Sequence, residues 1–334
     1  MQANDAPAPD RRGFLQAAGL AATALSLGRP SAAGAEEGRA VVKIGKVGVM
    51  SPGDMGQAVA IQLKAEGFDV YTALEHRSER TRGLAREAGL TDVSSLARLV
   101  GVCDAVLSIM DPGAALSFAR EVAEAMRASG RQVLIVDCNA IAPETAREIA
   151  RVVEAAGGRF LDGGIIGPPP RGGAKTKLFV SGPGAADLEQ LAGPQLLVQV
   201  AGDGITDACA LKMCYGALNK GTQALWLEVL VAAERLGVAR LLETQLLASQ
   251  ADRYRWVLGQ FPTLPPKAYR WVPEMLEEAK TLASVGMTPV MFQGAAEVYR
   301  FVAATPVGKE TPEEGRDKAR KGQDVVQLLA KPTG

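Results

Sequence analysis

Short apolar segments alternate with helical patterns over residues 40–203. The segments 41–50, 69–74, 104–110, 132–138, 159–166, 177–182 and 196–202 are apolar, are bounded by Gly, Asp or Pro, and are predicted to be β-strands. Between the early ones, residues 55–65, 80–88, 113–128 and 143–155 have the spacing of helices. Strict alternation, with crossovers of about ten residues or more, predicts an α/β domain whose parallel sheet is doubly wound.

The pattern changes after residue 203. Residues 207–237 are apolar on every helical face, which is typical of a helix that is buried all round, and Gly237 is its expected C-terminal end. Shorter helices are predicted at 241–256, 266–284, 289–303 and 312–329, several with proline near the start. These helices form a predicted all-helical domain at residues 204–330, after the sheet domain of residues 40–203. Because a small domain rarely covers so long a helix by itself, we expect a homodimer.

The first 35 residues have the composition of a targeting segment. The twin arginine Arg11-Arg12 precedes Phe14 and Leu15, a short alanine-rich apolar run follows, and an A-x-A site ends at Ala35. These features resemble a twin-arginine export signal and predict that the mature chain is periplasmic. Two alternatives are an alanine-rich tail with an accidental arginine pair, and a cytoplasmic enzyme whose N-terminus is a misread start.

The composition argues against several classes of site. Lys plus Arg and Asp plus Glu are both 37, so nothing points to a nucleic-acid partner, and no apolar run after the signal is long enough for a membrane anchor. The four cysteines form no C-x-x-C pair and His76 is the single histidine, so a multi-ligand metal site is not expected. The single histidine also argues against schemes in which histidine is the general base.

The segment VGVMSPGDMG at residues 47–56 joins the first predicted strand to the first helix. It has the context of a dinucleotide-binding G-x-G-x-x-G loop, although Ser51 replaces the first glycine. Gly53 allows a pyrophosphate close to the backbone, Gly56 allows close packing of helix and strand, and the amides of the helix start attract phosphate. The alternative is a tight turn that binds no nucleotide. The expected cofactor contacts are Ser51, Pro52, Gly53, Asp54 and Met55.

Charged residues after the second strand bear on the type of nicotinamide cofactor. Glu75 lies nineteen residues after Gly56, in the range where an acid holds the adenine ribose of NAD. Arg77, Ser78 and Arg82 crowd the same turn, and two guanidiniums with a hydroxyl suit the 2′-phosphate of NADP. We therefore expect NADP, with NAD as the alternative. The alternative interpretation of these charged residues is a solvated loop that carries charges of both signs and binds no cofactor.

Four motifs together resemble those of a known superfamily. They are D-M-G at 54–56, VDCNAIAP at 136–143, FLDGGIIGPPP at 160–170 and GDGITDACALK at 202–212. Over residues 41–330 the chain is similar to the β-hydroxyacid dehydrogenase and 6-phosphogluconate dehydrogenase superfamily, which includes the imine reductases. The resemblance implies a Rossmann domain, a helical C-terminal domain, and hydride transfer between a nicotinamide cofactor and a C–O or C–N centre of a small substrate.

The chain departs from this superfamily on the substrate side. Asn139-Ala140 stands where the hydroxy-acid enzymes carry Ser-Thr, and I-G-P at 166–168 stands where they carry Ser-Gly-Gly. Gly216 replaces the asparagine that follows the family's lysine by four residues. The resemblance therefore implies the fold and the cofactor class but not the substrate. The more apolar sequence favours an imine or a bulkier carbonyl compound.

Lys212 is the candidate for proton transfer. The matching lysine of the resembling enzymes acts as acid and base, and here the lysine lies in an apolar helix, where burial lowers the pKa of an ammonium group. The alternatives are a lysine that extends to solvent from a buried helix and one that binds a structural carboxylate. Lys220, two turns further on, is its substitute, and Asn219 is a candidate to orient the substrate or stabilise an oxyanion.

Further candidates follow the strand ends. Asn139 is expected to bind the substrate or the nicotinamide amide, or else to cap the helix that starts near Pro143. Met110 and Asp111 are expected near a ribose of the cofactor. The expected substrate contacts are Gly164, Ile166, Gly167 and Tyr215.

The sequence thus predicts an oxidoreductase that transfers a hydride between NADP(H) and a small substrate. An imine or ketone reductase is the first alternative. An exported nucleotide-binding sensor protein without turnover is the second.

Overall fold

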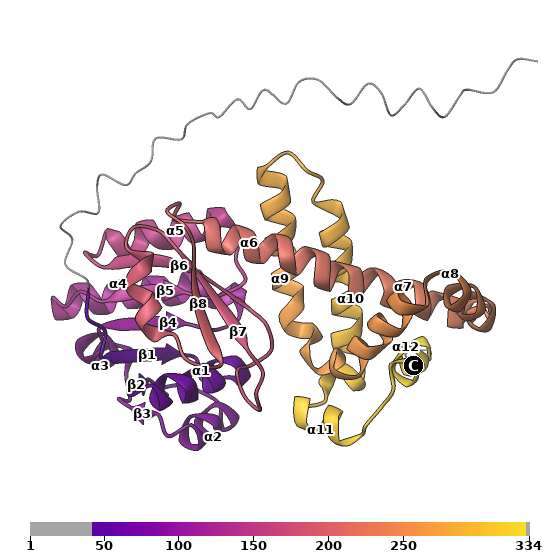
Figure 1. The fold of residues 1–334 in the computed structure, drawn as a ribbon, viewed down its shortest axis with the longest axis horizontal. Coiled ribbons are helices and arrows are strands. Elements are labelled where there is room, and N and C mark those ends of the chain that lie inside the picture. Colours follow the sequence, from indigo (N-terminus) through magenta and orange to yellow (C-terminus); the bar gives the residue numbers. More distant parts are fainter. Residues whose placement is uncertain (1–41, 332–334) are drawn as a thin grey trace, which may run out of the picture. The chain divides into compact units, whose positions relative to one another are not determined.

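An eight-stranded sheet forms the first part of the structure (Figure 1). The computed structural model describes residues 42–331, and the predicted signal segment lies outside them. The strands lie in the order β3-β2-β1-β4-β5-β6-β7-β8, which confirms the predicted doubly wound Rossmann-type sheet. Their bounds are β1 Lys46–Met50, β2 Asp69–Thr72, β3 Thr91–Asp92, β4 Ala105–Ser108, β5 Leu134–Asp137, β6 Arg159–Ile166, β7 Thr176–Ser181 and β8 Leu196–Gly202.

One pair of strands is antiparallel, which corrects the prediction of a fully parallel sheet. β6 and β7 pair antiparallel, with Gly164 opposite Phe179, whereas the other neighbouring strands pair in parallel. The Gly- and Pro-rich segment 167–175 joins β6 to β7 and contains no helix. It is too short for the crossover that parallel pairing requires, so the chain turns back on itself here.

Two apolar layers cover the two faces of the sheet. Side chains alternate along β4, so Val106 packs with Leu99 and Phe118 on one face, and Leu107 packs with Leu63 on the other. The helices of this segment are α1 Asp54–Ala65, α2 Glu79–Glu87, α3 Leu96–Val102, α4 Ala115–Ser129 and α5 Pro143–Glu154. The sequence pattern did not predict β3 or α3. β3 consists of only two exposed residues, and α3 is too short to show a clear helical periodicity of apolar positions.

The second part of the structure is helical, as predicted. α6 (Asp207–Gly216), a π-helical turn (Ala217–Gly221) and α7 (Thr222–Arg235) run without interruption, and Gly237 follows with a left-handed φ of 72°. The remaining helices are α8 Ala239–Gln260, α9 Ala268–Ser284, α10 Val290–Ala304, α11 Pro312–Asp317 and α12 Gly322–Ala330. The single helix predicted at 312–329 is two helices, because Ala319 adopts a positive φ of 45° between them.

The prediction that the helix at 207–237 is buried all round is wrong for the single chain. Leu227 and Leu230 are buried on one face of α7. Leu218, Leu225 and Leu236 are 77%, 59% and 76% exposed on the other side of the helix. Apolar sequence on every face therefore does not mean that this chain alone covers every face.

Within residues 42–331, no helix has both the length and the apolar character that crossing a bilayer requires.

A charged cluster fixes the connection between α10 and α11. The carboxylate of Glu310 accepts hydrogen bonds from Arg320 Nη1 and Nη2 at 2.7 and 2.6 Å and from Lys318 Nζ at 2.6 Å. The hydrogen bonds from Arg320, with those from Lys318, lower the pKa of Glu310 from 4.5 to about 2. Because the folded pKa lies below the unfolded one, the stabilisation is complete above pH 4.5 and is lost as the pH falls towards 2.

We predict that Glu310→Gln lowers the free energy of unfolding at pH 7 by about 2–3 kcal/mol, since it removes hydrogen bonds to a charged group. The difference from wild type narrows below pH 4.5. Urea unfolding of wild type and variant, at pH 7 and at a pH below 4.5, measures the difference in the free energy of unfolding. Glu297→Gln is the control, because Glu297 is an exposed partner of Arg300 and its loss costs less than about 1 kcal/mol. Equal losses in the two variants contradict the prediction.

Candidate active site

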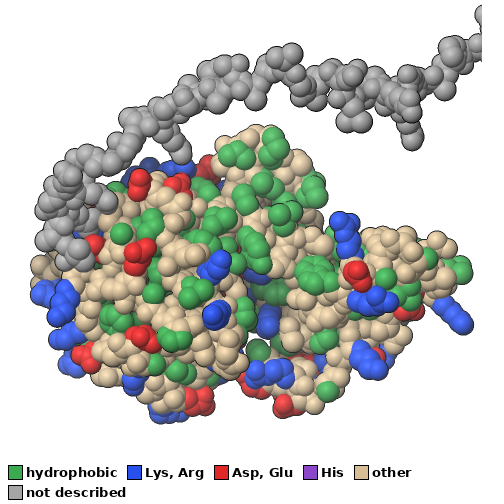
Figure 2. All heavy atoms as spheres, viewed as in Figure 1, with side chains coloured by type: hydrophobic (Ala, Val, Ile, Leu, Met, Phe, Trp, Pro, Cys, Tyr) green, Lys and Arg blue, Asp and Glu red, His purple; other side chains and the backbone are tan. Residues whose placement is uncertain are grey.

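A cleft of about 410 Å³ opens where β1, β4 and β5 end, facing the start of α9. Ser51 follows β1, Ile109 follows β4 and Cys138 follows β5, and all three line it together with Lys212 of α6 and Trp271 of α9. In Figure 2 the surface is hollowed between the sheet and the helical segment, with Lys and Arg side chains near the hollow. Ligands of doubly wound sheets bind at this edge.

The loop after β1 offers unpaired amides to the cleft. Gly53 precedes α1 and supplies no side-chain cap to the first turn of the helix, whereas Ser78 caps α2 and Ser95 caps α3. Gln57 N is the first amide of α1 that reaches back to a helical partner, the carbonyl oxygen of Gly53. Gly53 N is bonded to Ser51 O at 2.8 Å, so the amides of residues 54–56 and the helix dipole form the anion site that holding a diphosphate requires.

The two glycines of this loop have different surroundings. A Cβ on Gly56 would overlap the carbonyl oxygen of Ser51, so only glycine fits where α1 passes the loop. A Cβ on Gly53 would meet nothing within 4 Å, so this position is open towards the cleft. Asp54 in the first turn pairs with Arg171 from the segment between β6 and β7, and this pairing neutralises a charge that would otherwise repel phosphate.

Residues of α2 line the cleft at other positions than predicted. Ser78 uses its hydroxyl as the cap of α2, and Arg82 Nε donates to the carbonyl oxygen of Arg77 at 3.1 Å. The cleft is lined instead by Arg80 and Thr81 in the first turn of α2. The sequence gives the charge of this turn, but the direction of each side chain depends on where the helix begins.

Asn139 holds the ends of β4 and β5 together. Its Nδ2 donates to Ser108 Oγ at 2.8 Å and to Asp137 Oδ2 at 2.9 Å, and its Oδ1 accepts from Met110 N at 2.6 Å. The side chain lines the cleft, but a contact with substrate or cofactor would require one of these bonds to be exchanged. Asn139 does not cap α5, whose N-cap is Ala142.

Lys212 has a carbonyl group as its polar partner in the cleft. Its Nζ donates to Cys138 O at 3.0 Å, and it forms no ion pair within residues 42–331. Burial lowers the pKa of Lys212; the carboxylate of Glu274 opposes this shift, and the charge of Lys220 adds to it. A lysine with lowered proton affinity at the end of a cleft is suited to proton exchange with a ligand.

Four residues of α9 complete the cleft, and the sequence analysis did not predict them. They are Tyr269, Arg270, Trp271 and Glu274. Glu274 pairs with Lys220, the predicted substitute for Lys212, and the Lys220 ammonium lies 5.3 Å from the centre of the Trp271 ring. An amphipathic pattern at residues 268–284 predicts a helix but does not indicate that its first turns face the sheet. The sequence therefore contains no signal that would have identified these four residues as part of the cleft.

The structure brings most of the predicted site residues together. Ser51, Gly53, Asp54, Met55, Met110, Asp111, Asn139, Gly167 and Lys212 line the cleft, and Pro52, Arg77, Ser78, Arg82, Gly164, Ile166, Tyr215 and Asn219 do not. Gly164 lies under α6, where a Cβ would be 2.8 Å from Ala208 O. Tyr215 is 51% exposed, and Asn219 Oδ1 accepts from Gln223 Nε2 at 2.9 Å. The chemical roles assigned to these residues stay predictions.

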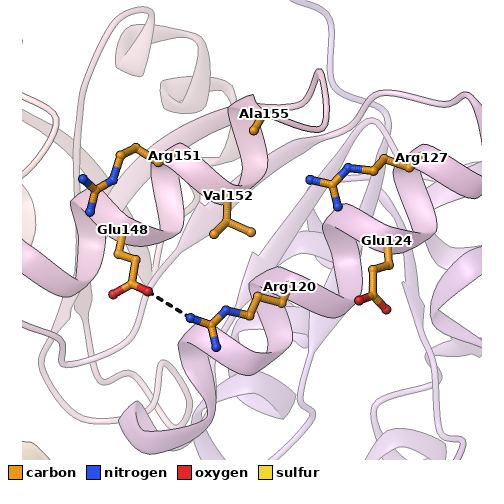
Figure 3. A pocket seen from close by; sticks show the side chains of 7 residues that line it. All are labelled: Arg120, Glu124, Arg127, Glu148, Arg151, Val152 and Ala155. Atoms are coloured by element: carbon orange, nitrogen blue, oxygen red, sulfur yellow. Dashed lines mark hydrogen bonds and ion pairs between the residues drawn. The ribbon is translucent and has the colours of Figure 1, made fainter.

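A second hollow, of about 470 Å³, lies between α4 and α5 (Figure 3). Its lining is mostly charged, and Arg120 Nη2 donates to Glu148 Oε1 at 3.0 Å. The lining contains no glycine loop and no lysine, cysteine or histidine. It therefore lacks the glycine loop that phosphate binding at a helix start would use, and its acid–base groups are the carboxylates of Glu124 and Glu148, the second of which is paired with Arg120.

We predict that Gly56→Ala lowers the free energy of unfolding by about 1–3 kcal/mol, because the added methyl group overpacks against Ser51. Gly53→Ala is the matched control and changes stability by less than about 0.5 kcal/mol, because its φ of −78° suits alanine and its surroundings are open. Thermal and urea unfolding measure both variants. A stable Gly56→Ala protein, or equal losses in both variants, would show that the loop is packed differently.

Comparison with known proteins identifies the two parts of the chain. Residues 43–197 match the NAD binding domain of 6-phosphogluconate dehydrogenase, and residues 233–302 match a domain of unknown function, DUF1932. An uncharacterized 28.5 kDa protein of Methanothermus fervidus is 25% identical over 262 residues, which make up 77% of this chain and 98% of the relative.

Solved structures agree with these matches. A conserved protein of unknown function, whose structure is similar to those of 3-hydroxyacid dehydrogenases, is 31% identical, with 77% of this chain and 96% of that chain covered and a TM-score of 0.56. The 3-hydroxyisobutyrate dehydrogenase of Mycobacterium tuberculosis shares the fold, at 19% identity, with 83% and 100% covered and a TM-score of 0.62. The chain therefore belongs to the 6-phosphogluconate dehydrogenase and 3-hydroxyacid dehydrogenase family of oxidoreductases, with a nicotinamide-cofactor domain followed by a helical domain.

Proposed function

We propose that this protein is an oxidoreductase that transfers a hydride between NADP(H) and a C–O or C–N centre of a small substrate. One observation carries the proposal. The uncapped start of α1 and the carbonyl-bound ammonium of Lys212 line the same cleft of about 410 Å³. An anion site and a proton-exchanging group in one cleft are what a nicotinamide-dependent reaction requires of its protein.

The residues of the cleft fit the parts of a dinucleotide. The amides that follow Gly53, together with Ser51, would hold the diphosphate, and Met110 and Asp111 after β4 would lie beside a ribose. When bound, the nicotinamide ring supplies or accepts the hydride. The protein's own task is then to orient the substrate and to manage one proton.

Lys212 would hold that proton at Nζ. Its hydrogen bond to Cys138 O fixes the ammonium group without an opposite charge, so the proton is released more readily than from an ion-paired lysine. In the direction of reduction Lys212 gives the proton to the oxygen or nitrogen of the substrate, and in the direction of oxidation it takes the proton back.

The preference for NADP rests on positive charge beside α2. Arg77 precedes Ser78, the cap of α2, and Arg80 and Thr81 line the cleft one turn away. Guanidinium and hydroxyl groups at a helix start suit a 2′-phosphate. Glu75, the residue that would favour NAD, lies beside His76 with their side chains 57% and 91% exposed.

The substrate side of the cleft is partly apolar. Ile165, Tyr269 and Trp271 line it together with the Lys220–Glu274 pair. This lining favours an imine or a ketone with a carbon skeleton that fills the space beside the rings over a compact hydroxy acid with two negative charges.

We also propose that the active form is a homodimer and that it is exported. Leu218, Leu225 and Leu236 form an exposed apolar ridge, and a groove of about 610 Å³ between α7 and α10 includes Val231 and Phe301. A ridge and a groove on the same helical segment suit a second copy of the chain. The proposal of export to the periplasm rests on the sequence of residues 1–35 alone.

We predict that Lys212→Ala lowers turnover at least about 100-fold, because a positioned acid–base group contributes that much, and leaves the Kd for NADPH within about twofold. NADPH oxidation with a panel of ketones, cyclic imines and 3-oxo acids measures turnover. Lys177→Ala on β7 is the control and keeps full turnover. Undiminished turnover of Lys212→Ala would exclude the lysine as proton donor, and NADPH binding without turnover of any substrate in wild type would favour the sensor.

We predict that Arg77→Ala and Arg80→Ala each weaken NADPH binding by about 1.5–3 kcal/mol, the contribution of a charge-assisted hydrogen bond, and leave NADH binding within about twofold. Fluorescence titration with both nucleotides measures the ratio. Arg86→Ala in the last turn of α2 is the control. If each variant lost equal affinity for NADPH and NADH, or lost no affinity for either, Glu75 would be the residue expected to contact the ribose.

A further inference from the structure

Glu278 of α9 is a carboxyl group without a polar partner. The residue is 0% exposed, and neither carboxyl oxygen has a hydrogen-bond partner within residues 42–331. Burying an unpaired carboxylate is far more costly than burying a neutral acid, and buried polar groups are normally hydrogen-bonded. Such an exception beside a candidate active site requires a physical explanation.

The carboxyl group occupies a gap in the helix that carries both cleft lysines. Gly216 lies four residues after Lys212 and four before Lys220, so the three positions share one face of the helix. A Cβ on Gly216 would be 2.5 Å from Glu278 Oε1 and 3.7 Å from Glu274 Oε1. A side chain at Gly216 would therefore displace the carboxyl group of Glu278, because α9 presents its two carboxyl groups there.

Titratable groups of α9, the π-helical turn and α10 surround Glu278. Glu274 lies one turn before it on α9 and pairs with Lys220 of the π-helical turn. Tyr299 of α10 donates its hydroxyl to the carbonyl oxygen of Lys220 at 2.7 Å. Lys212 of α6 lies one turn before Gly216, and its own charged neighbours include Asp137 at the end of β5.

These surroundings keep the proton on Glu278. Burial, and next the negative charge of Glu274, raise the pKa of Glu278 from 4.5 to about 9, while Lys220 opposes the shift. The side chain is therefore neutral at pH 7, which explains how a carboxyl group without partners is tolerated at this depth.

We propose that Glu278 is a positioning residue that remains an uncharged carboxylic acid, so that Glu274 is the only acid of α9 paired with Lys220 and Lys212 is left without an acidic partner. The proposal rests on the proposed role of Lys212. A second negative charge at Gly216 would hold the proton on Lys212 and slow its transfer. The neutral acid fills the gap and leaves Lys212 able to exchange its proton.

The direct test is infrared spectroscopy of the full chain without cofactor or substrate. We expect the difference between wild type and Glu278→Gln at pH 7 to contain the C=O stretch of a protonated carboxylic acid, and this band in wild type to disappear as the pH is raised past about 9. In Glu274→Gln the band disappears at lower pH, because the neighbouring negative charge is gone. A wild-type protein without this band at pH 7 overturns the proposal.

The second test follows Lys212 itself, through its rate of acetylation by acetic anhydride at pH 8, read by mass spectrometry. Because Gln replaces a neutral group by a neutral group, we expect the rate in Glu278→Gln to stay within about twofold of wild type. An ionised Glu278 in wild type would instead give about a tenfold faster rate in the variant for each unit by which the pKa of Lys212 falls. Exposed Lys177 in the same digest is the internal control.

These readouts separate the proposal from the proposed function. Both are made on the protein without nucleotide, so they stand even if no nicotinamide cofactor binds. If Glu278→Gln does not fold, the pH titration of the band in wild type and in Glu274→Gln decides the matter. A band that titrates at the same pH in both proteins overturns the assignment to Glu278.

Discussion

The close approach of α6 to β6 determines where the candidate acid–base group lies. Gly164 has no side chain at the point where Ala208 O would contact it, and Cys209 N donates to the buried Asp162 Oδ2 at 2.7 Å. Burial raises the pKa of Asp162 to about 7, while the bond from Cys209 opposes this shift. With its first turn fixed to the sheet in this way, α6 carries Lys212 to the end of β5, where Cys138 O accepts a hydrogen bond from Lys212 Nζ.

Most charges around the cleft are paired, and this makes the unpaired groups informative. Asp54 pairs with Arg171, Lys220 with Glu274 and Arg80 with Glu313. Within residues 42–331, the groups of the cleft left without such partners are the first amides of α1, the Lys212 ammonium on α6, and the charged side chains of Asp111 and Arg270. The amides and the ammonium suit a ligand with a negatively charged portion and a reacting centre, because unsatisfied groups at a cleft edge bind what the protein does not supply.

Much of the fold could be predicted from the sequence, because the alternation of strands and helices is strong over residues 40–203. The antiparallel β7 could not, since the apolar run at 177–182 reads the same in either direction and only the missing helix at 167–175 decides its pairing. Apolar residues throughout 207–237 predicted the long helix but not its exposed ridge, because composition does not tell which chain covers a face.

The site divides in the same way. The contributions of Ser51, Met110 and Cys138 follow from topology, because loops after neighbouring parallel strands meet at one edge of the sheet. The contributions of Trp271 and Glu274 depend on how α9 packs across that edge, which no local pattern encodes. The sequence showed only that Gly216 differs from the asparagine of the resembling family. The structure gives a reason for the glycine, because the carboxyl group of Glu278 lies where a side chain at this position would be.

Nicotinamide nucleotide binding in the cleft between α1 and Lys212 is the claim on which the account depends. Isothermal titration calorimetry of the purified protein with NADPH, NADP, NADH and NAD tests it most directly. The account predicts saturable binding of one nucleotide per chain, with NADPH the tightest. No heat with any of the four would contradict a redox function for this cleft.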